Sequence, residues 1–274
     1  MNLSDFYKDK VVLVTGSSMG IGKELSRQVL IHGGKVVMTA RNATRLNAVA
    51  VEFKEYADNI LIHAGDATDY ENNALTVQKT IARFGKLDVL INNAALSCFG
   101  EVEMMKPEVA RQVIDVNIYG SLFPVMVAIP ELKKTKGSVL FISSLAGFHG
   151  LPGYSAYSLS KMSLKALFQS LRGELKASGV FAGIAYVGFT QNEGEKKMLT
   201  PEGQWVKTPD RPKKLTVSRE TTALKLLRQI MKRKYSDTHS LLGFFTRIMS
   251  RYFPTLLQAI LSKNYRKETS SSSD

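Results

Sequence analysis

The feature that most constrains the fold is a short apolar run followed at once by a glycine-rich turn and a helical pattern. Residues 10–15 are rich in β-branched residues and flanked by charge, which is typical of a buried parallel strand. Gly16, Gly20 and Gly22 follow, and a helix is expected from Lys23 onward. Glycines let a backbone approach a phosphate closely, and a helix N-terminus offers it free N–H groups and a positive dipole. Directly after an N-terminal strand, this turn predicts a dinucleotide site.

The same alternation continues along the chain. Helical patterns separate the further apolar runs, and alternation of this kind favours a parallel sheet with helices on both faces. Strands are expected at 34–39, 59–63, 87–91, 137–142 and 180–186, and helices at 42–56, 69–84, 107–132, 154–177 and 219–232. We therefore predict an α/β fold: a single doubly wound Rossmann-fold domain over residues 1–235, with a parallel sheet of about six or seven strands. The seventh strand is expected to be short or absent near Tyr235.

The residues that end these strands are candidate cofactor contacts, because ligands bind beyond the carboxyl ends of parallel strands. The second strand ends at Arg41, without the carboxylate that many NAD-binding proteins use for the ribose 2′-hydroxyl. A bidentate contact from Arg41 to a 2′-phosphate would favour NADP(H) over NAD(H), but a solvated loop arginine gives the same pattern. Asp66, followed by Ala67, either accepts from the adenine amino group or caps the next helix, as Asp69 can. Asn93-Ala94 allows close backbone contact, or is an ordinary turn.

Ser144, Tyr157 and Lys161 carry the candidate chemistry. Ser144 follows the fifth strand, and Tyr157 and Lys161 lie one turn apart on one face of the next helix. A tyrosine has a pKa of about 10, and an ammonium held close to it favours the phenolate, so the pair can serve general acid–base catalysis. Ser144 would hold a carbonyl oxygen beside the phenol. A tyrosine and a lysine at this spacing also occur as a snorkelling surface pair, so the neighbouring motifs decide between the two readings.

Together these segments resemble the short-chain dehydrogenase/reductase family over about residues 8–235. The resemblance is carried, in order and spacing, by Thr15-Gly16-x-x-x-Gly20-Ile21-Gly22, Asp66, Asn92-Asn93-Ala94, Asn117, Ser144, Tyr157 and Lys161. It implies that Tyr157 is the acid/base, that Lys161 binds the nicotinamide ribose and lowers the tyrosine pKa, and that Ser144 orients the substrate. It also implies that Asn117 holds a water in a proton relay. From its apolar helical surroundings alone, Asn117 would bind water or backbone, or satisfy a kink.

The family pattern also implies the set of cofactor contacts. They are Gly16, Ser18, Met19, Gly20, Ile21, Gly22, Arg41, Asp66, Ala67, Asn93, Ala94, Tyr157, Lys161, Gly188 and Asn192. Two positions depart from the pattern. Ala95 replaces a glycine, which a negative φ would tolerate. Asn192 takes the place of a threonine that holds the carboxamide, after a turn that lacks the usual proline. We assign no metal-binding residues.

Composition limits where the protein acts. Cys98 is the only cysteine in 274 residues, so no intrachain disulfide can form and a cytoplasmic site is expected. The chain lacks an apolar run of about 18 residues and a signal-like start, so no membrane-spanning helix is predicted. The net charge of +13 has its largest surplus beyond Thr190. Such a surplus fits nucleic acid, anionic lipid or an acidic partner.

The segment beyond the sixth strand is expected to cover the substrate and to meet a surface. Residues 190–217, polar and punctuated by glycine and proline, are expected to be a substrate lid, in which Trp205 lines the mouth or anchors the lid. Residues 236–267 are expected to form an amphipathic helical extension, whose part 240–267 has the apolar stripe and cationic flank of a membrane-surface helix. Packing on the core or on a second subunit is the alternative. Residues 268–274, mostly serine, are expected to be disordered.

These features favour an NADP(H)-dependent oxidoreductase that interconverts a ketone and a secondary alcohol on a hydrophobic substrate. The C-terminal segment is similar to the lipid- and steroid-reducing branch of the family, which includes 11β-hydroxysteroid dehydrogenases and 3-ketosphinganine reductases. A non-catalytic dinucleotide-binding regulator or scaffold is the alternative, and a complete Ser144, Tyr157 and Lys161 set argues against it. Bulky apolar residues in the tail favour lipid over nucleic acid. Family resemblance implies a homodimer or tetramer through 107–132 and 154–177, and the tail adds a peripheral membrane location to the cytoplasmic one.

Overall fold

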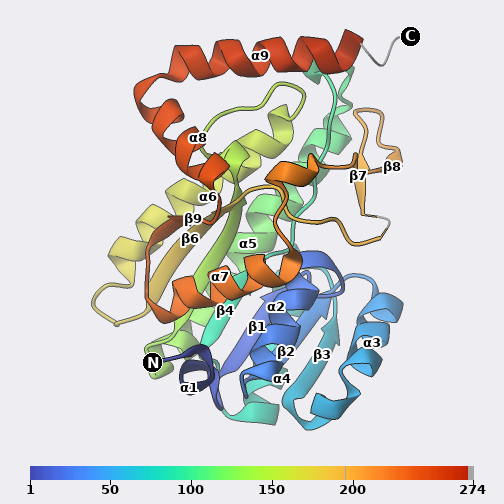
Figure 1. The fold of residues 1–274 in the computed structure, drawn as a ribbon. Helices are drawn as coiled ribbons and strands as arrows, with labels where there is room; N and C mark the ends of the chain where they lie inside the picture. Colours follow the sequence, from blue (N-terminus) through green and yellow to red (C-terminus); the bar gives the residue numbers. More distant parts are fainter. Residues whose placement is uncertain (195, 271–274) are drawn as a thin grey trace.

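Seven parallel strands form the central sheet in the order β3-β2-β1-β4-β5-β6-β9, in a computed structural model that describes residues 1–194 and 196–270 (Figure 1). Neighbouring strands are parallel throughout this sheet. The strands are β1 (Val11–Thr15), β2 (Lys35–Ala40), β3 (Ile60–Ala64), β4 (Val89–Asn92), β5 (Ser138–Ser144), β6 (Phe181–Val187) and β9 (Ser236–Thr238). The seventh strand is short, as predicted, with three residues.

Helices cover both faces of the sheet because both faces of its strands are apolar. One face carries α2 (Gly20–Ile31), α3 (Ala43–Glu52) and α7 (Arg219–Met231), and the other carries α4 (Tyr70–Phe84), α5 (Pro107–Thr135) and α6 (Ser155–Glu174). In β1, the side chains of Val12 and Val14 join the first of these cores, while Val11 and Leu13 join the second. The doubly wound α/β fold predicted from the alternation is confirmed.

Local capping explains where several helices begin. The carboxylate of Asp69 accepts from the backbone N–H of Asn72 at 3.0 Å and starts α4, and the hydroxyl of Ser218 accepts from Thr221 N–H at 3.0 Å and starts α7. Each such cap contributes about 0.5–2 kcal/mol. Gly85 ends α4 in the left-handed conformation, at φ +76°. The helix predicted over 42–56 instead stops at Glu52 and continues as the 3₁₀ turn η1 (Lys54–Asn59).

The longest helix, α5, is rich in apolar residues, and many of them are buried. Among the described residues, it is the helix that is long and apolar enough to cross a membrane by length and composition. In the structure it packs into the core of one sheet face, where Val113, Val125 and Leu132 are fully or almost fully buried. Its apolar character therefore follows from contact with the sheet and with its neighbours α4 and α6.

Beyond β6 lie residues 190–194 and 196–217, which we call the lid after their predicted role, and then two helices that we call the roof. The lid contains the antiparallel hairpin β7 (Lys197–Leu199) and β8 (Trp205–Lys207), and a bridge between Thr190 and Val217 closes its base. Two helices follow, α8 (Leu241–Tyr252) and α9 (Pro254–Ser270), and α9 lies at the end of the molecule farthest from the N-terminus (Figure 1). Residues 268–270 continue α9, and the disorder predicted for residues 268–274 stays a prediction. Residues 271–274 lie outside the described part of the chain.

Candidate active site

The glycine-rich turn after β1 has the shape of a phosphate cradle. Gly16 and Gly20 have φ values of +65° and +61°, which favour glycine. A Cβ added to Gly16 would come within 2.9 Å of the Cα of Ala94, whereas one added to Gly20 would meet no atom within 4 Å. Met19 stands in the N-cap position of α2, with Ser18 and Ile21 half-buried beside it. The turn therefore fits a dinucleotide pyrophosphate at the start of α2.

Asn93 holds this turn against the end of β4. Its side-chain Nδ2 donates to the carbonyl oxygens of Thr15 at 2.9 Å and Gly16 at 3.0 Å. The hydroxyl of Thr15 in turn accepts from the backbone N–H groups of Asn93 and Ala94, both at 3.0 Å. Ala95 is not among the described non-glycine residues that have a positive φ. Its backbone therefore tolerates the methyl group, as expected. The Asn93 side chain thus positions the turn.

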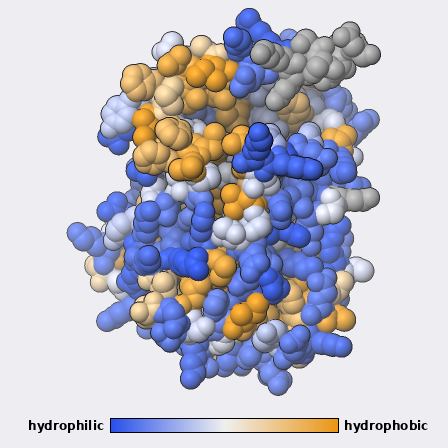
Figure 2. Space-filling model, in the orientation of Figure 1, coloured by the Kyte–Doolittle hydropathy of each residue, from blue (hydrophilic) through white to orange (hydrophobic). Residues whose placement is uncertain are grey.

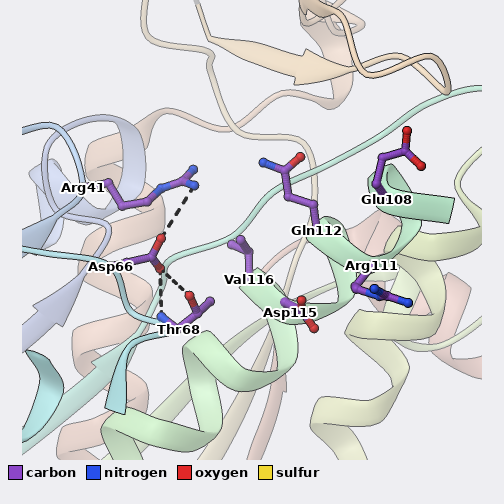
Figure 3. Close-up of a pocket in the computed structure, with 8 residues that line it drawn as sticks. All are labelled: Arg41, Asp66, Thr68, Glu108, Arg111, Gln112, Asp115 and Val116. Carbon is purple, nitrogen blue, oxygen red and sulfur yellow. Dashed lines mark hydrogen bonds and ion pairs between the residues drawn. The ribbon is translucent and has the colours of Figure 1, made fainter. Parts of the chain in front are cut away.

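A cleft of about 300 Å³ marks the end of the site where the adenosine is expected (Figure 3). Asp66 accepts through one carboxylate oxygen from the N–H of Thr68 at 2.8 Å and from its hydroxyl at 2.9 Å, while the other oxygen lies 3.9 Å from Arg41. Asp66 therefore closes a turn, and Asp69 makes the helix cap. The Ala67 carbonyl accepts from Asn73 at 2.9 Å. The cleft is lined by Arg41, Asp66, Thr68, Glu108, Arg111, Gln112, Asp115 and Val116.

A second exposed cation near Arg41 was missed by the sequence reasoning. Arg45, in the first turn of α3, donates from its guanidinium to the sulfur of Met19 at 3.4 Å. Arg45 therefore links the first turn of α3 to the glycine-rich turn after β1. Its position four residues after Arg41, at the start of the predicted helix, was the available signal.

The three residues proposed for catalysis come together at the carboxyl end of β5. The side chain of Ser144 lies close enough to the Tyr157 phenol to lower its pKa, and the Nζ of Lys161 lies 5.8 Å from the centre of the Tyr157 ring. Lys161 is 3% exposed, and its Nζ donates to the carbonyl oxygen of Ile142 at 3.0 Å. The hydroxyl of Ser143 donates to the Lys161 carbonyl at 3.0 Å, which fixes α6 against β5. Lys161 is therefore no snorkelling surface residue.

The charges of these groups differ from the sequence expectation. Burial raises the pKa of Tyr157 above its ordinary value, and this outweighs the hydrogen bond from Ser144 and the positive charge of Arg211, which both lower it. Burial, helped by the charge of Lys196, lowers the pKa of Lys161 to about 7. The net shift of the Tyr157 pKa is therefore upward, whereas Lys161 was expected to lower it; burial removes much of the lysine's own charge near neutral pH, and its effect on the phenol stays a prediction. Arg211, which acts on the phenol from the lid, was not foreseen.

Asn117 is fully engaged by protein groups. Its Oδ1 accepts from the N–H of Leu96 at 2.7 Å, and its Nδ2 donates to the Leu96 carbonyl and to the hydroxyl of Ser160, both at 2.8 Å. Of the roles considered for a buried asparagine, the structure shows binding to backbone. Asn117 thereby ties the loop after β4 to α5 and to α6, which carries Tyr157. Its part in a water relay stays a prediction.

Gly188 and Asn192 lie where β6 leads into the lid. A Cβ on Gly188 would come within 2.9 Å of the Ser240 hydroxyl, so this glycine permits the close approach of the start of α8. The Nδ2 of Asn192 donates to the Pro209 carbonyl within the lid at 3.4 Å. Contacts of both residues with a cofactor stay predictions.

A series of aromatic rings runs from the site to the C-terminal roof. The ring of Tyr154 lies 6.2 Å from that of Tyr157 and 4.8 Å from that of Phe99, whose ring is 6.3 Å from Tyr265 on α9. The Tyr265 hydroxyl donates to Glu101 at 3.0 Å. The C-terminal helix thus covers the loops that border Tyr157, and those loops present aromatic side chains.

Comparison with known proteins gives relatives of one kind. The family model for short chain dehydrogenases matches residues 10–202. The 11-beta-hydroxysteroid dehydrogenase-like 4A of Arabidopsis thaliana is 32% identical over 208 residues, which are 73% of this chain and 68% of the relative. The 3-dehydrosphinganine reductase of Danio rerio is 30% identical over 221 residues, 75% of this chain and 67% of the relative.

Solved structures share the fold. A short-chain dehydrogenase from Streptomyces avermitilis superposes with a TM-score of 0.76, 22% identity, and coverage of 97% of this chain and 100% of that one. An alcohol dehydrogenase from the archaeon Thermococcus sibiricus, complexed with 5-hydroxy-NADP, superposes with a TM-score of 0.71, 23% identity, and coverage of 84% and 95%. With the family match over most of the chain, these findings show that the protein belongs to the short-chain dehydrogenase family and is an oxidoreductase that acts on CH–OH groups with a nicotinamide dinucleotide.

Proposed function

We propose that the protein is an NADP(H)-dependent oxidoreductase that interconverts a ketone and a secondary alcohol on a hydrophobic, lipid- or steroid-like substrate. The observation that carries the proposal is the placement of Ser144 beside Tyr157 at the carboxyl end of β5, with the buried Lys161 one turn further along α6. The glycine-rich turn lies at the same edge of the sheet, the carboxyl ends of its strands, where a dinucleotide is expected to bind.

The chain's own residues would handle the proton and the carbonyl oxygen. The bound cofactor supplies or accepts the hydride. Tyr157 would pass its phenolic proton to the oxygen as the alcohol forms, and Ser144 would donate a hydrogen bond to the same oxygen. Because burial raises the pKa of Tyr157, its phenol stays protonated at neutral pH and suits the reductive direction. Lys161, held by Ile142, positions the ring.

Two arginines support the preference for NADP(H). Arg41 at the end of β2 and Arg45 in the first turn of α3 are both exposed, and Arg45 reaches Met19 of the glycine-rich turn. Guanidinium groups bind phosphate by paired hydrogen bonds, which a 2′-phosphate offers and a 2′-hydroxyl does not. Arg41 would then exchange its 3.9 Å ion pair with Asp66 for the phosphate.

A membrane surface is the proposed source of the substrate. Figure 2 shows an apolar area over α8 and the adjoining part of α9. We call it the roof patch; its exposed side chains are Leu241, Phe244, Phe245, Tyr252, Phe253, Leu256 and Ile260. Arg247, Arg251 and Lys263 lie on the same helices and suit anionic headgroups. The other side of this roof packs on the loops beside Tyr154, so a lipid would pass from the patch to the catalytic tyrosine. The protein would be peripheral on its membrane, on the cytoplasmic side.

Self-association through α5 and α6 is also proposed. Tyr119 and Met126 on α5 and Leu159 and Met162 on α6 are large apolar side chains with 43–56% of their surface exposed. Pairing these helices with a second copy would bury them, which fits the dimer or tetramer expected from the family. The roof patch lies on other elements and would remain open in such an assembly.

The proposed activity is tested with Tyr157→Phe and a matched control, Tyr70→Phe, which alters an exposed tyrosine on α4. Long-chain 3-keto compounds and ketosteroids serve as substrates, with NADPH oxidation as the readout. We expect Tyr157→Phe to lower kcat by roughly a hundredfold or more while the Kd for NADPH changes by less than about twofold. Full activity in this variant would refute the role of Tyr157. A wild-type protein that binds NADPH but reduces none of the substrates would favour the dinucleotide-binding scaffold.

A further inference from the structure

A carboxylate from the lid lies on the phosphate cradle. One oxygen of Glu193 accepts a hydrogen bond from the backbone N–H of Gly20, the first residue of α2. The same oxygen lies 2.9 Å from the guanidinium of Arg219, and the other oxygen lies 3.3 Å from the Nζ of Lys23. Three positive or proton-donating groups from two helices therefore converge on one side chain of the lid.

These partners are those that a phosphate group would use. Gly20 N–H is one of the free donors at the positive end of α2, and cations beside such a donor complete an anion site. Partial burial raises the pKa of Glu193, but the Gly20 hydrogen bond and the charges of Lys23 and Arg219 outweigh it, so its pKa is lowered. Glu193 is accordingly an anion at neutral pH, seated where the glycine-rich turn is shaped for a pyrophosphate.

We propose that Glu193 is an internal substitute for the cofactor's pyrophosphate and gates the dinucleotide site. The proposal builds on the proposed function, because it assumes a dinucleotide at the glycine-rich turn. A carboxylate and a phosphate cannot accept from Gly20 N–H together, so the cofactor binds by displacing Glu193. Displacement frees Arg219 to face the pyrophosphate, leaves Lys23 paired with Glu52 at 2.7 Å, and releases Glu193 from α2.

The lid is built so that this exchange can stay local. Backbone hydrogen bonds from Gln191 N–H to the Val217 carbonyl, and from Val217 N–H to the Phe189 carbonyl, both at 2.9 Å, close its base. Glu193 lies just beyond that closed base. Its release from α2 can therefore leave Phe189 and Gln191 in their places. The gate would couple cofactor binding to lid position, so that cofactor binds before substrate.

The test compares cofactor affinity in Glu193→Gln and Glu193→Ala with a matched control, Glu202→Gln. Glu202 is exposed, lies in the same lid and loses the same charge. We expect the two Glu193 variants to bind NADPH with a Kd lowered by roughly five- to tenfold, and the control to match wild type within about twofold. The affinity for 2′-AMP, which lacks the pyrophosphate, should be unchanged in all variants. Calorimetric titration gives these values without turnover.

A second measurement needs only the wild-type chain. Saturating NADP⁺ should slow hydrogen exchange in peptides covering the glycine-rich turn and speed it in peptides covering Glu193. Slowed exchange in both regions, or equal NADPH affinities in wild type and both Glu193 variants, would overturn the gate. If wild type binds NADPH but the variants bind it no better, the gate alone fails. If wild type binds neither NADPH nor NADH, the proposed function fails together with it.

Discussion

The Nζ of Lys161 donates its hydrogen bond to the carbonyl oxygen of Ile142, at 3.0 Å, and lies 5.8 Å from the centre of the Tyr157 ring. The lysine side chain is thus hydrogen-bonded to the backbone of β5, beside the ring of Tyr157. This arrangement fixes the geometry of the pair, but it buries the ammonium, and burial lowers the pKa of Lys161 to about 7. Burying the Lys161 ammonium beside Tyr157 therefore lowers the folding stability by an amount that depends on pH.

The first prediction concerns that cost. Between about pH 7 and pH 10 the unfolded chain holds a proton on Lys161 that the folded chain has lost, so the folding stability contributed by this group rises with pH. Lys161→Met removes this dependence. We expect the difference in Tm, variant minus wild type, to be largest below about pH 7 and to shrink towards about pH 10. The lost hydrogen bond to Ile142 adds a constant offset only. Lys165→Met, an exposed lysine one turn on, serves as control; parallel curves for Lys161→Met and wild type would contradict the argument.

The second prediction concerns Arg211 and the pKa of the phenol. The positive charge of Arg211 lowers the pKa of Tyr157, so Arg211→Gln should raise it. Alcohol oxidation needs the phenolate, so the rise of kcat/KM with pH in that direction should shift to higher pH by roughly half a unit to one unit. Lys213→Gln removes the same charge from an exposed lid position and should leave the profile in place. A profile unmoved by Arg211→Gln would exclude this electrostatic contribution.

Much of the fold follows from local sequence patterns. Gly16 and Gly20 adopt positive φ because the chain must turn sharply between β1 and α2, and Asp69 and Ser218 cap the helices that they precede. Each of these choices depends on a few neighbouring residues, so a single sequence contains the signal. The strand runs and their alternation with helices add the topology.

The details of the site depend on contacts between distant segments. The partners of Asn117 are Leu96 and Ser160, which lie on other elements, so the sequence could show only that a buried amide needs partners. The pKa of Lys161 depends on how deeply α6 packs against β5, which no motif records. The approach of Arg211 to Tyr157 likewise depends on how the lid folds back. Motif spacing identified the candidate catalytic residues, whereas their charges required the tertiary structure.

The third prediction tests the cofactor preference. Arg41→Gln and Arg45→Gln should each lower the ratio of kcat/KM for NADPH to that for NADH, by roughly ten- to a hundredfold, because each removes a charged contact to the 2′-phosphate. NADH itself should be used equally well by wild type and variants. Lys54→Gln, an exposed lysine near the end of α3, is the control. If neither arginine variant changes the ratio of kcat/KM for NADPH to that for NADH, Arg41 and Arg45 do not determine the cofactor preference.

The fourth prediction tests the roof patch. Phe244 and Phe245 are 53% and 60% exposed on α8, so transferring the exposed part of each from water into a lipid interface should contribute about 1–2 kcal/mol. The double substitution of both by Glu should therefore reduce co-sedimentation with anionic vesicles by more than roughly tenfold. Val51→Glu places a charge at an exposed apolar residue on α3, away from the roof, and should bind vesicles as wild type does. High salt should weaken wild-type binding only in part, because the apolar contribution is not screened. If wild type fails to sediment, or if the double variant sediments as well as wild type, the membrane contact is excluded and the patch would have to be explained by a protein partner.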